Sequence, residues 1–359
     1  MTFQIFWFIL IAILWTGFFV LEGFDFGVGM LHSAVGRDEA ERRAAINTIG
    51  PLWDGNEVWL IVAGAAMFAA FPGWYATMFS GLYLALVLLL ASLIIRGVSF
   101  EYRGKRDAAR WRHTWDWALT VGSVLAPLLI GIALGDLLAG LPIDAAQNYT
   151  GSFWDLFRPY AVFTGVTFVL ICLLHGATFL CLKTTGEMHE RSRLQARRIA
   201  PFAVAAVTGF VIWTHVTASS TFFLSLIDLL AILAVLAAAL LVYARRDGFA
   251  FATTTVTIAA CILAIFTDLY PNLMVSSTST AYNLTVHNAA SPPYSLKAMT
   301  IVVVVFLPLV LIYQAWTYYV FRRRVSASEF QPPAPTSAAA PEPEPRPTAP
   351  DDAAARRAT

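Results

Sequence analysis

Charged residues and cysteines are scarce in this sequence of 359 residues. Only 13% of the residues are Asp, Glu, Lys or Arg, whereas 58% are hydrophobic, and the mean hydropathy is +0.65. Soluble domains contain about 25% charged residues, so this composition argues against an ordinary soluble protein. The three cysteines, Cys172, Cys181 and Cys261, each stand alone in an apolar run, which argues against a disulfide or a structural metal site.

Motifs of several enzyme classes are also missing. The sequence contains no glycine-rich nucleotide loop, no nucleophile elbow and no His/Asp hydrolase pattern. Residues 101–117 are basic with interleaved aromatics, as in some nucleic-acid-binding segments. Because this stretch lies between two apolar runs, it is more typical of an anchor at the membrane surface, and we expect no nucleic-acid partner.

Apolar runs recur at the length needed to cross a bilayer, about 20 residues. We therefore predict an all-α, polytopic membrane protein with about nine transmembrane helices. The predicted spans are 5–30, 56–72, 75–95, 115–138, 160–182, 200–217, 221–243, 249–270 and 297–320. They form a membrane domain over residues 1–325. Residues 326–359 are rich in Pro and Ala, which predicts a disordered cytoplasmic tail.

The basic residues predict how the chain is oriented in the membrane. With nine spans, all but two of the 24 Lys and Arg residues fall on one side, and the exceptions are Arg158 and Lys297. Connections rich in Lys and Arg stay in the cytoplasm. The N-terminus is therefore expected outside and the C-terminus inside.

Four carboxylates interrupt the first two apolar runs. Glu22 and Asp25 lie near the end of the first span, and Asp54 and Glu57 lie at the start of the second. Each pair has i, i+3 spacing, which places both side chains on one helical face. A helix rises 1.5 Å per residue, so both pairs reach the cytoplasmic level of the membrane, where we expect the four acids to converge.

These carboxylates also have structural interpretations. Asp54 could be the N-cap of the second helix, with Glu57 at its third position as in a capping box. Asp25 is harder to explain in this way, because a carboxylate inside a span needs a partner or a proton. Arg96 and Asp116 lie at the same level and could join the acids in a network, although an Arg at a helix end often extends to the interface.

Several other polar or small residues lie within or beside the predicted spans. Gly23 and Gly27 form a small-xxx-small pair that lets a neighbouring helix approach closely, and Trp53 is a further candidate for packing or a subunit interface. The histidines inside predicted spans are His175 and His215, and neither has a neighbour at metal-site spacing. An interhelical hydrogen bond is their expected role, so we predict no metal or haem ligand. Asp228 and Asp268 fit either buried polar contacts or helix caps.

Several stretches resemble a known family. LEGFDFGVGML and the segment from INTIGPLWDGNEVW to LIIRGVSFEYR are similar to subunit II of cytochrome bd-type quinol oxidases, and so are WRHTWDW, GSVLAPLLIGIALGDLLAG and PNLMVSSTS. The resemblance implies part of a terminal oxidase in the bacterial cytoplasmic membrane. Such an enzyme oxidises membrane quinol and reduces dioxygen to water with protons from the cytoplasm.

The family also implies how the work is divided between subunits. Haems b558, b595 and d belong to subunit I, so this chain is expected to ligate none and to hold no catalytic residue. The acid of the WDGN motif, Asp54, is implied to border a proton path at the contact with subunit I. Asp25, Glu57 and Glu22 are further candidates by position. A bound quinone or lipid and small accessory subunits stay open.

Two other functions remain open at this point. A proton-coupled secondary transporter would also carry carboxylates in its helices, but near the midplane. A purely structural membrane subunit would need no proton path.

Overall fold

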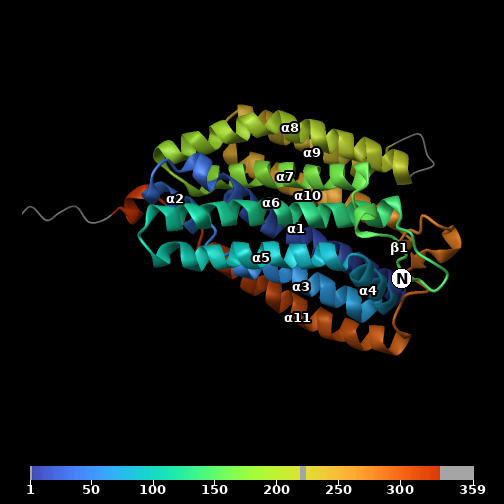
Figure 1. Ribbon diagram of the computed structural model, residues 1–359. Coiled ribbons are helices and arrows are strands. Elements are labelled where there is room, and N and C mark those ends of the chain that lie inside the picture. Colours follow the sequence, from blue (N-terminus) through green and yellow to red (C-terminus); the bar gives the residue numbers. More distant parts are fainter. Residues whose placement is uncertain (1, 219–223, 332–359) are drawn as a thin grey trace, which may run out of the picture.

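The computed structural model describes residues 2–218 and 224–331, which form eleven α-helices, four short 3-10 helices and one two-stranded sheet (Figure 1). The α-helices are α1 Phe3–Val35, α2 Glu39–Asn47, α3 Trp53–Ala70, α4 Pro72–Gly81, α5 Tyr83–Tyr102, α6 Ala109–Ala139, α7 Pro159–Lys183, α8 Gly186–Ala218, α9 Leu226–Tyr243, α10 Asp247–Leu269 and α11 Pro293–Val320. The short elements are η1 Arg103–Lys105, η2 Phe153–Leu156, η3 Thr280–Tyr282, η4 Ala327–Phe330, β1 Asn272–Met274 and β2 Leu284–Thr285, with the two strands antiparallel.

Eight helices of the described residues are long and apolar enough to cross a membrane, namely α1 and α5 to α11. The predicted all-α polytopic membrane fold is therefore confirmed, but with eight such helices where about nine were expected. The missing one is α3, whose first turns carry Asp54, Asn56 and Glu57 and so lower its mean hydropathy. The predicted span 75–95 is also interrupted, because Leu82 separates the short α4 from α5.

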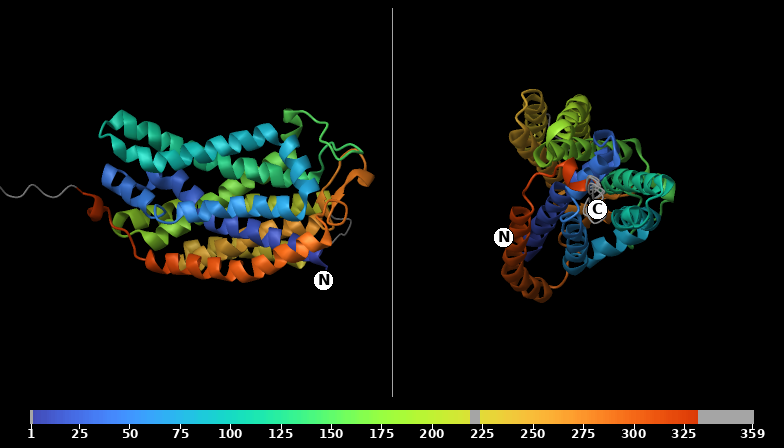
Figure 2. Two further views of the ribbon diagram at one scale, coloured as in Figure 1. Left: turned by 90° about the horizontal axis from the view of Figure 1, so that it is seen from below. Right: turned by 90° about the vertical axis from the view of Figure 1, so that its left-hand side faces the viewer.

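The helices run side by side along one axis, with α1 in the middle of the bundle (Figures 1 and 2). α1 contacts α3, α6, α7 and α10 along its length. Twenty of its 33 residues are buried, which is unusual for a membrane helix that faces lipid. Both Glu22 and Asp25 therefore lie inside the protein and not at its surface.

Glycines set the closest crossings in the bundle. A Cβ atom on Gly27 of α1 would lie 2.6 Å from the Cα of Gly176 on α7, and one on Gly131 of α6 would lie 2.7 Å from the Cα of Gly165. At Gly23 the nearest atoms to a new Cβ are 3.5 Å away, an ordinary contact. The close approach of α1 to α7 therefore depends on Gly27 and not on Gly23.

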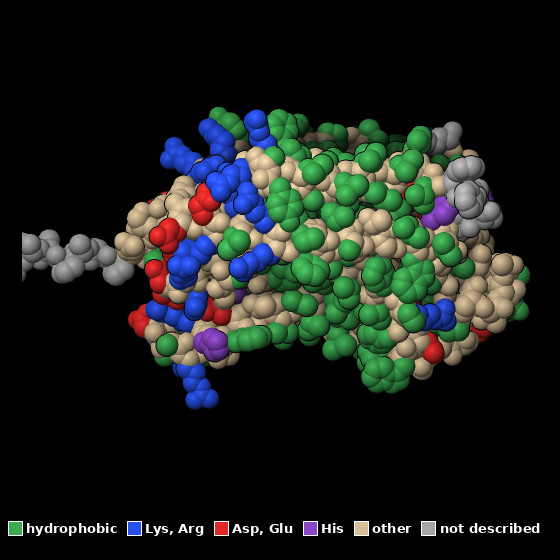
Figure 3. All heavy atoms as spheres, turned by 90° about the horizontal axis from the view of Figure 1, so that it is seen from above, with side chains coloured by type: hydrophobic (Ala, Val, Ile, Leu, Met, Phe, Trp, Pro, Cys, Tyr) green, Lys and Arg blue, Asp and Glu red, His purple; other side chains and the backbone are tan. Residues whose placement is uncertain are grey.

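The two ends of the bundle differ in charge. Lys and Arg side chains gather at the end where α2 and the start of α8 lie (Figure 3). The opposite end is covered by the segments that precede α7 and α11, joined by a bridge between Leu141 and Ser276. Apolar side chains cover the surface between the two ends, as expected for a protein that faces lipid.

α11 is held to the bundle mainly by polar contacts near its ends. Leu296 is its one residue classed as buried. Ser291, just before the helix, donates from Oγ to the carbonyl of Ala69 at 2.7 Å. Beyond its other end, Lys183 Nζ donates to the carbonyl of Arg323 at 3.0 Å. Along the helix itself, Met299, Val303, Leu307 and Tyr318 are partly buried and pack against the core.

The described chain continues past residue 325, the predicted end of the membrane domain, to residue 331. Ser326 and Glu329 form a capping box at η4, and the Arg43 guanidinium lies 5.8 Å from the centre of the Phe330 ring. Residues 332–359 lie outside the described residues, so the disordered tail stays a prediction for them.

Gly27→Ala is expected to destabilise the fold more than Gly23→Ala. The new Cβ at position 27 would overlap the Gly176 backbone and force α1 and α7 apart, a strain that costs about 1–3 kcal/mol. At position 23 the new methyl group makes only ordinary contacts. Thermal unfolding of the purified variants, followed by circular dichroism, measures the difference. Equal melting temperatures would show that the two backbones do not meet at Gly27.

Candidate functional site

Two of the four predicted acids contact one arginine, and a third lies beside them. Arg96 Nη1 lies 2.5 Å from Glu22 Oε1 and 3.2 Å from Glu57 Oε2. Glu22, on α1, and Arg96, on α5, have fully buried side chains, while 22% of the Glu57 side chain on α3 is exposed. Asp25 lies one turn after Glu22 and is also fully buried. The site therefore joins α1, α3 and α5.

Arg96 does not lie at a helix end, so the interpretation of an interfacial arginine is wrong. α5 continues for six residues beyond it, to Tyr102. Its guanidinium lies 4.9 Å from the centre of the Phe26 ring and 5.3 Å from that of Phe100. A charge in such surroundings needs an ionic partner, which Glu22 supplies.

Asn56 connects Asp25 to the last long helix. Its Nδ2 donates to Asp25 Oδ2 at 2.6 Å and to the carbonyl of Leu21 at 3.2 Å. Its Oδ1 accepts from Gln314 Nε2 at 3.0 Å and from the Tyr318 hydroxyl at 2.8 Å, both on α11. The sequence pattern does not single out Asn56, because an amide in a polar helix start looks like part of a cap. The signal was its place between two acids in an otherwise apolar span.

Asp54 is exposed and lies apart from the buried cluster. It occupies the first turn of α3, whose N-cap is Leu52 and has no side-chain hydrogen bond, so the capping-box interpretation is wrong. Trp53 beside it stacks on Phe100 of α5, with ring centres 4.9 Å apart. Trp53 thus packs within this chain, and Asp54 remains accessible one turn before Glu57.

The buried cluster has spare hydrogen-bonding capacity. Among the described residues, Glu22 Oε2, Asp25 Oδ1 and Arg96 Nε and Nη2 are buried and have no hydrogen-bond partner. Buried polar atoms are nearly always paired with protein or water, so this group of atoms calls for an explanation beyond packing.

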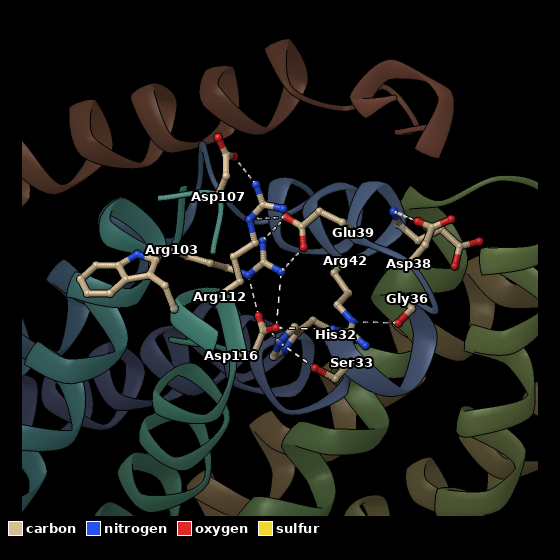
Figure 4. A network of polar contacts seen from close by, with 12 residues as sticks. His32, Ser33, Gly36, Asp38, Glu39, Arg42, Arg103, Asp107, Arg112 and Asp116 are labelled. Atoms are coloured by element: carbon tan, nitrogen blue, oxygen red, sulfur yellow. Dashed lines mark hydrogen bonds and ion pairs between the residues drawn. The ribbon is translucent and has the colours of Figure 1, made fainter. Parts of the chain in front are cut away.

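A second network lies nearer the basic end and contains Asp116, which does not reach Arg96 (Figure 4). Asp116 Oδ1 accepts from Arg103 Nε at 2.5 Å and lies 3.2 Å from His32 Nε2. Arg103 also holds Glu39 with two hydrogen bonds, of 2.8 and 2.9 Å. His32 lies two residues beyond the predicted first span, yet it is fully buried within α1. This network ties α1, α2, η1 and α6 together.

His175 makes interhelical contacts through both ring nitrogens. Its Nδ1 lies 2.7 Å from Thr254 Oγ1, its Nε2 lies 3.1 Å from the carbonyl of Val20, and its ring stacks on Phe251. Both ring nitrogens are thus occupied between helices. Over the described residues, no group of three or more His, Cys, Asp and Glu is placed to hold a metal ion.

Asp228 and Asp268 lie in different surroundings. Asp228 forms a capping box with Ser225 at the start of α9, and His215 Nδ1 lies 3.7 Å from Asp228 Oδ2. Asp228 is therefore a helix cap that also contacts a histidine. Asp268, partly buried near the end of α10, has one unpartnered oxygen within the described part of the chain.

Apolar grooves run along α3. One of about 670 Å³ lies between α1, α3 and α11, with Trp59 and Leu307 in its wall and Gln314 at its edge. Another of about 620 Å³ lies between α3, α4 and α5. Their lining suits hydrocarbon chains, such as those of a lipid or the tail of a quinone.

Comparisons with known proteins agree on one family. A family model described as cytochrome bd terminal oxidase subunit II matches residues 3–321. The chain is 45% identical over 327 residues to cytochrome bd ubiquinol oxidase subunit 2 of Bacillus subtilis, covering 90% of this chain and 97% of that one. It is 38% identical over 362 residues to cytochrome bd-I ubiquinol oxidase subunit 2 of Escherichia coli K12, covering 90% and 96%.

A solved structure shares the fold. It is titled as the bd oxidase from Geobacillus thermodenitrificans and aligns with a TM-score of 0.72 at 17% identity, over 89% of this chain and 99% of that chain. At this identity the match concerns the arrangement of the helices alone.

Arg96→Gln is expected to destabilise the protein strongly. It leaves Glu22 buried without its cation, and removing one partner of a buried ion pair costs about 3–5 kcal/mol. The double variant Glu22→Gln with Arg96→Gln removes both charges and should recover most of this loss. Melting temperatures of the purified variants make the comparison. A single variant as stable as the wild type would contradict the assigned ion pair.

Proposed function

The chain belongs to the cytochrome bd terminal oxidase subunit II family, and on this basis we propose that it is the second subunit of a quinol oxidase in a bacterial cytoplasmic membrane. Its partner is subunit I, which binds haems b558, b595 and d, oxidises quinol and reduces dioxygen to water. This chain ligates no haem and packs against that partner. The names of its relatives, which are subunits 2 of ubiquinol oxidases, support the proposal.

Within the complex, the chain contributes part of a proton path from the cytoplasm. The observation that supports this role is the graded exposure of its acids: Asp54 is exposed, Glu57 is partly exposed and Glu22 is fully buried. Carboxyl groups can accept and release protons along such a series. An arginine cannot be deprotonated in a protein, so Arg96 supplies fixed positive charge and not a relay step.

The orientation follows from the charge of the two ends. The Lys and Arg side chains gather at one end of the bundle (Figure 3), and such an end faces the cytoplasm. The N-terminus then lies outside and the C-terminus inside. The polar start of α3 belongs to the cytoplasmic half in this arrangement, so protons reach Asp54 from the cytoplasm.

Reporter insertions test this orientation. A reporter at residues 106–108, between η1 and α6, is expected to give a cytoplasmic signal, and one at residues 145–148, between α6 and η2, an external one. Both segments are largely exposed, so insertion should leave the bundle intact. Exchanged signals at the two sites would overturn the orientation.

Asp54→Asn tests the proton path. The substitution keeps the size of the side chain and removes its titratable group. Oxygen consumption per haem should fall on the order of tenfold, equivalent to about 1.4 kcal/mol in the barrier, with haem content unchanged. Because Asp54 is not the N-cap of α3, a loss of capping does not confound the result. Glu101→Gln, which removes an exposed acid from α5, is the matched control and should retain normal turnover.

The outcome separates the remaining alternatives. Normal turnover in Asp54→Asn would favour a purely structural subunit. The proton-coupled transporter loses its support, because the family is that of a terminal oxidase.

A further inference from the structure

We propose that Glu22 and Asp25 together hold one exchangeable proton, and that Asn56 is the residue that positions this pair. The inference rests on the proposed proton path and adds a storage point inside this subunit. Two observations support it independently: the charge balance of the buried groups, and the polar atoms that have no partner.

The charge balance concerns three fully buried side chains. Glu22, Asp25 and Arg96 each have zero exposure, and they carry two carboxyl groups and one guanidinium. With both carboxyls ionised, the trio would hold one negative charge that no cation among the described residues offsets, and Glu57, 3.2 Å from the same guanidinium, adds a further acid. An unneutralised charge in such a place is strongly unfavourable. A single proton makes the buried trio neutral.

The polar contacts of the two carboxyls indicate where that proton lies. Glu22 Oε1 forms the ion pair with Arg96, and Asp25 Oδ2 accepts a hydrogen bond from Asn56. Within the described residues, Asp25 has no ion pair, and the second oxygen of each carboxyl has no hydrogen-bond partner. The two carboxyls share one face of α1 and interact electrostatically. An O–H on one of them can donate to the carboxylate of the other, directly or through one water, which satisfies both free oxygens.

Asn56 orients this pair because its side-chain amide satisfies all of its hydrogen bonds in only one of its two flipped orientations. Oδ1 accepts from two donors of α11, the Gln314 amide and the Tyr318 hydroxyl. Nδ2 is therefore turned toward Asp25 and the carbonyl of Leu21. A bond from Nδ2 leaves Oδ2 an acceptor, so the shared proton stays on the side of Asp25 that faces Glu22. α11 thereby takes part in holding the site.

Infrared spectroscopy of the purified complex tests the shared proton. The spectrum in alkaline buffer is subtracted from the spectrum in acidic buffer. The wild type should show a carboxylic-acid C=O band that shifts in D2O. Glu22→Gln and Asp25→Asn should each abolish this band completely, because one carboxylate and the Arg96 guanidinium then remain and the buried group has no net charge without a proton. Glu57→Gln should retain it, since the buried trio is unchanged.

Other outcomes overturn the proposal. A band that survives in either single variant, or that is divided between them, would mean that no proton is shared. Asp25→Asn breaks no ion pair, so it keeps the test decisive if Glu22→Gln assembles poorly. The haem spectrum reports assembly for each variant.

Asn56→Leu and Tyr318→Phe test the positioning role. Asn56→Leu removes the donor to Asp25 and should shift the band while leaving its area unchanged. Tyr318→Phe removes one of two donors to Asn56 and should give a smaller shift in the same direction. Unshifted bands in both would overturn the role of Asn56. The turnover of Asp54→Asn is independent of these spectra, so failure of the proton path and failure of the shared proton are distinguishable.

Discussion

The ion pair between Arg96 and Glu22 constrains the packing of the helices around it. A guanidinium deep in an apolar bundle must have a carboxylate within reach, so α5 has to present position 96 to α1. α6 then closes over the same place through Gly122, where a Cβ atom would lie 2.9 Å from the Cβ of Arg96. The pair thus helps to set the register between α1 and α5, and the glycine lets α6 cover it.

α1 can pair with Arg96 and also pack closely against α7, because these two contacts use different faces of the helix. At 3.6 residues per turn, Glu22 and Asp25 point to nearly the opposite side from Gly23 and Gly27. The glycine side meets α7, where the Gly27 and Gly176 backbones come together. The acid side meets α3 and α5. A short stretch of sequence therefore separates close backbone packing from ionic contacts.

Sequence patterns could predict this division of faces, but not the partners of each side chain. Apolar runs located most helices, and i, i+3 spacing located the acids. Arg96 and Asp116 looked equivalent at the same membrane level, yet they belong to separate networks, because the choice depends on how α5 and α6 rotate against α1. The hydrogen-bond donors to Asn56 come from α11, which lies some 260 residues further along the chain. Contacts of this kind depend on tertiary packing and leave no local pattern.

The first turn of α3 carries polar residues that lower the hydropathy of this helix. Its polar residues place α3 outside the helices that qualify as spans by hydropathy. Along the helix, Asp54 and Asn56 point in nearly opposite directions, so one turn can expose an acid and send an amide to Asp25. The positive end of the helix dipole also favours a carboxylate in this first turn, by about 0.3–1 kcal/mol. The polar residues that weaken α3 as a membrane span thus include both an exposed carboxylate and the amide that binds Asp25.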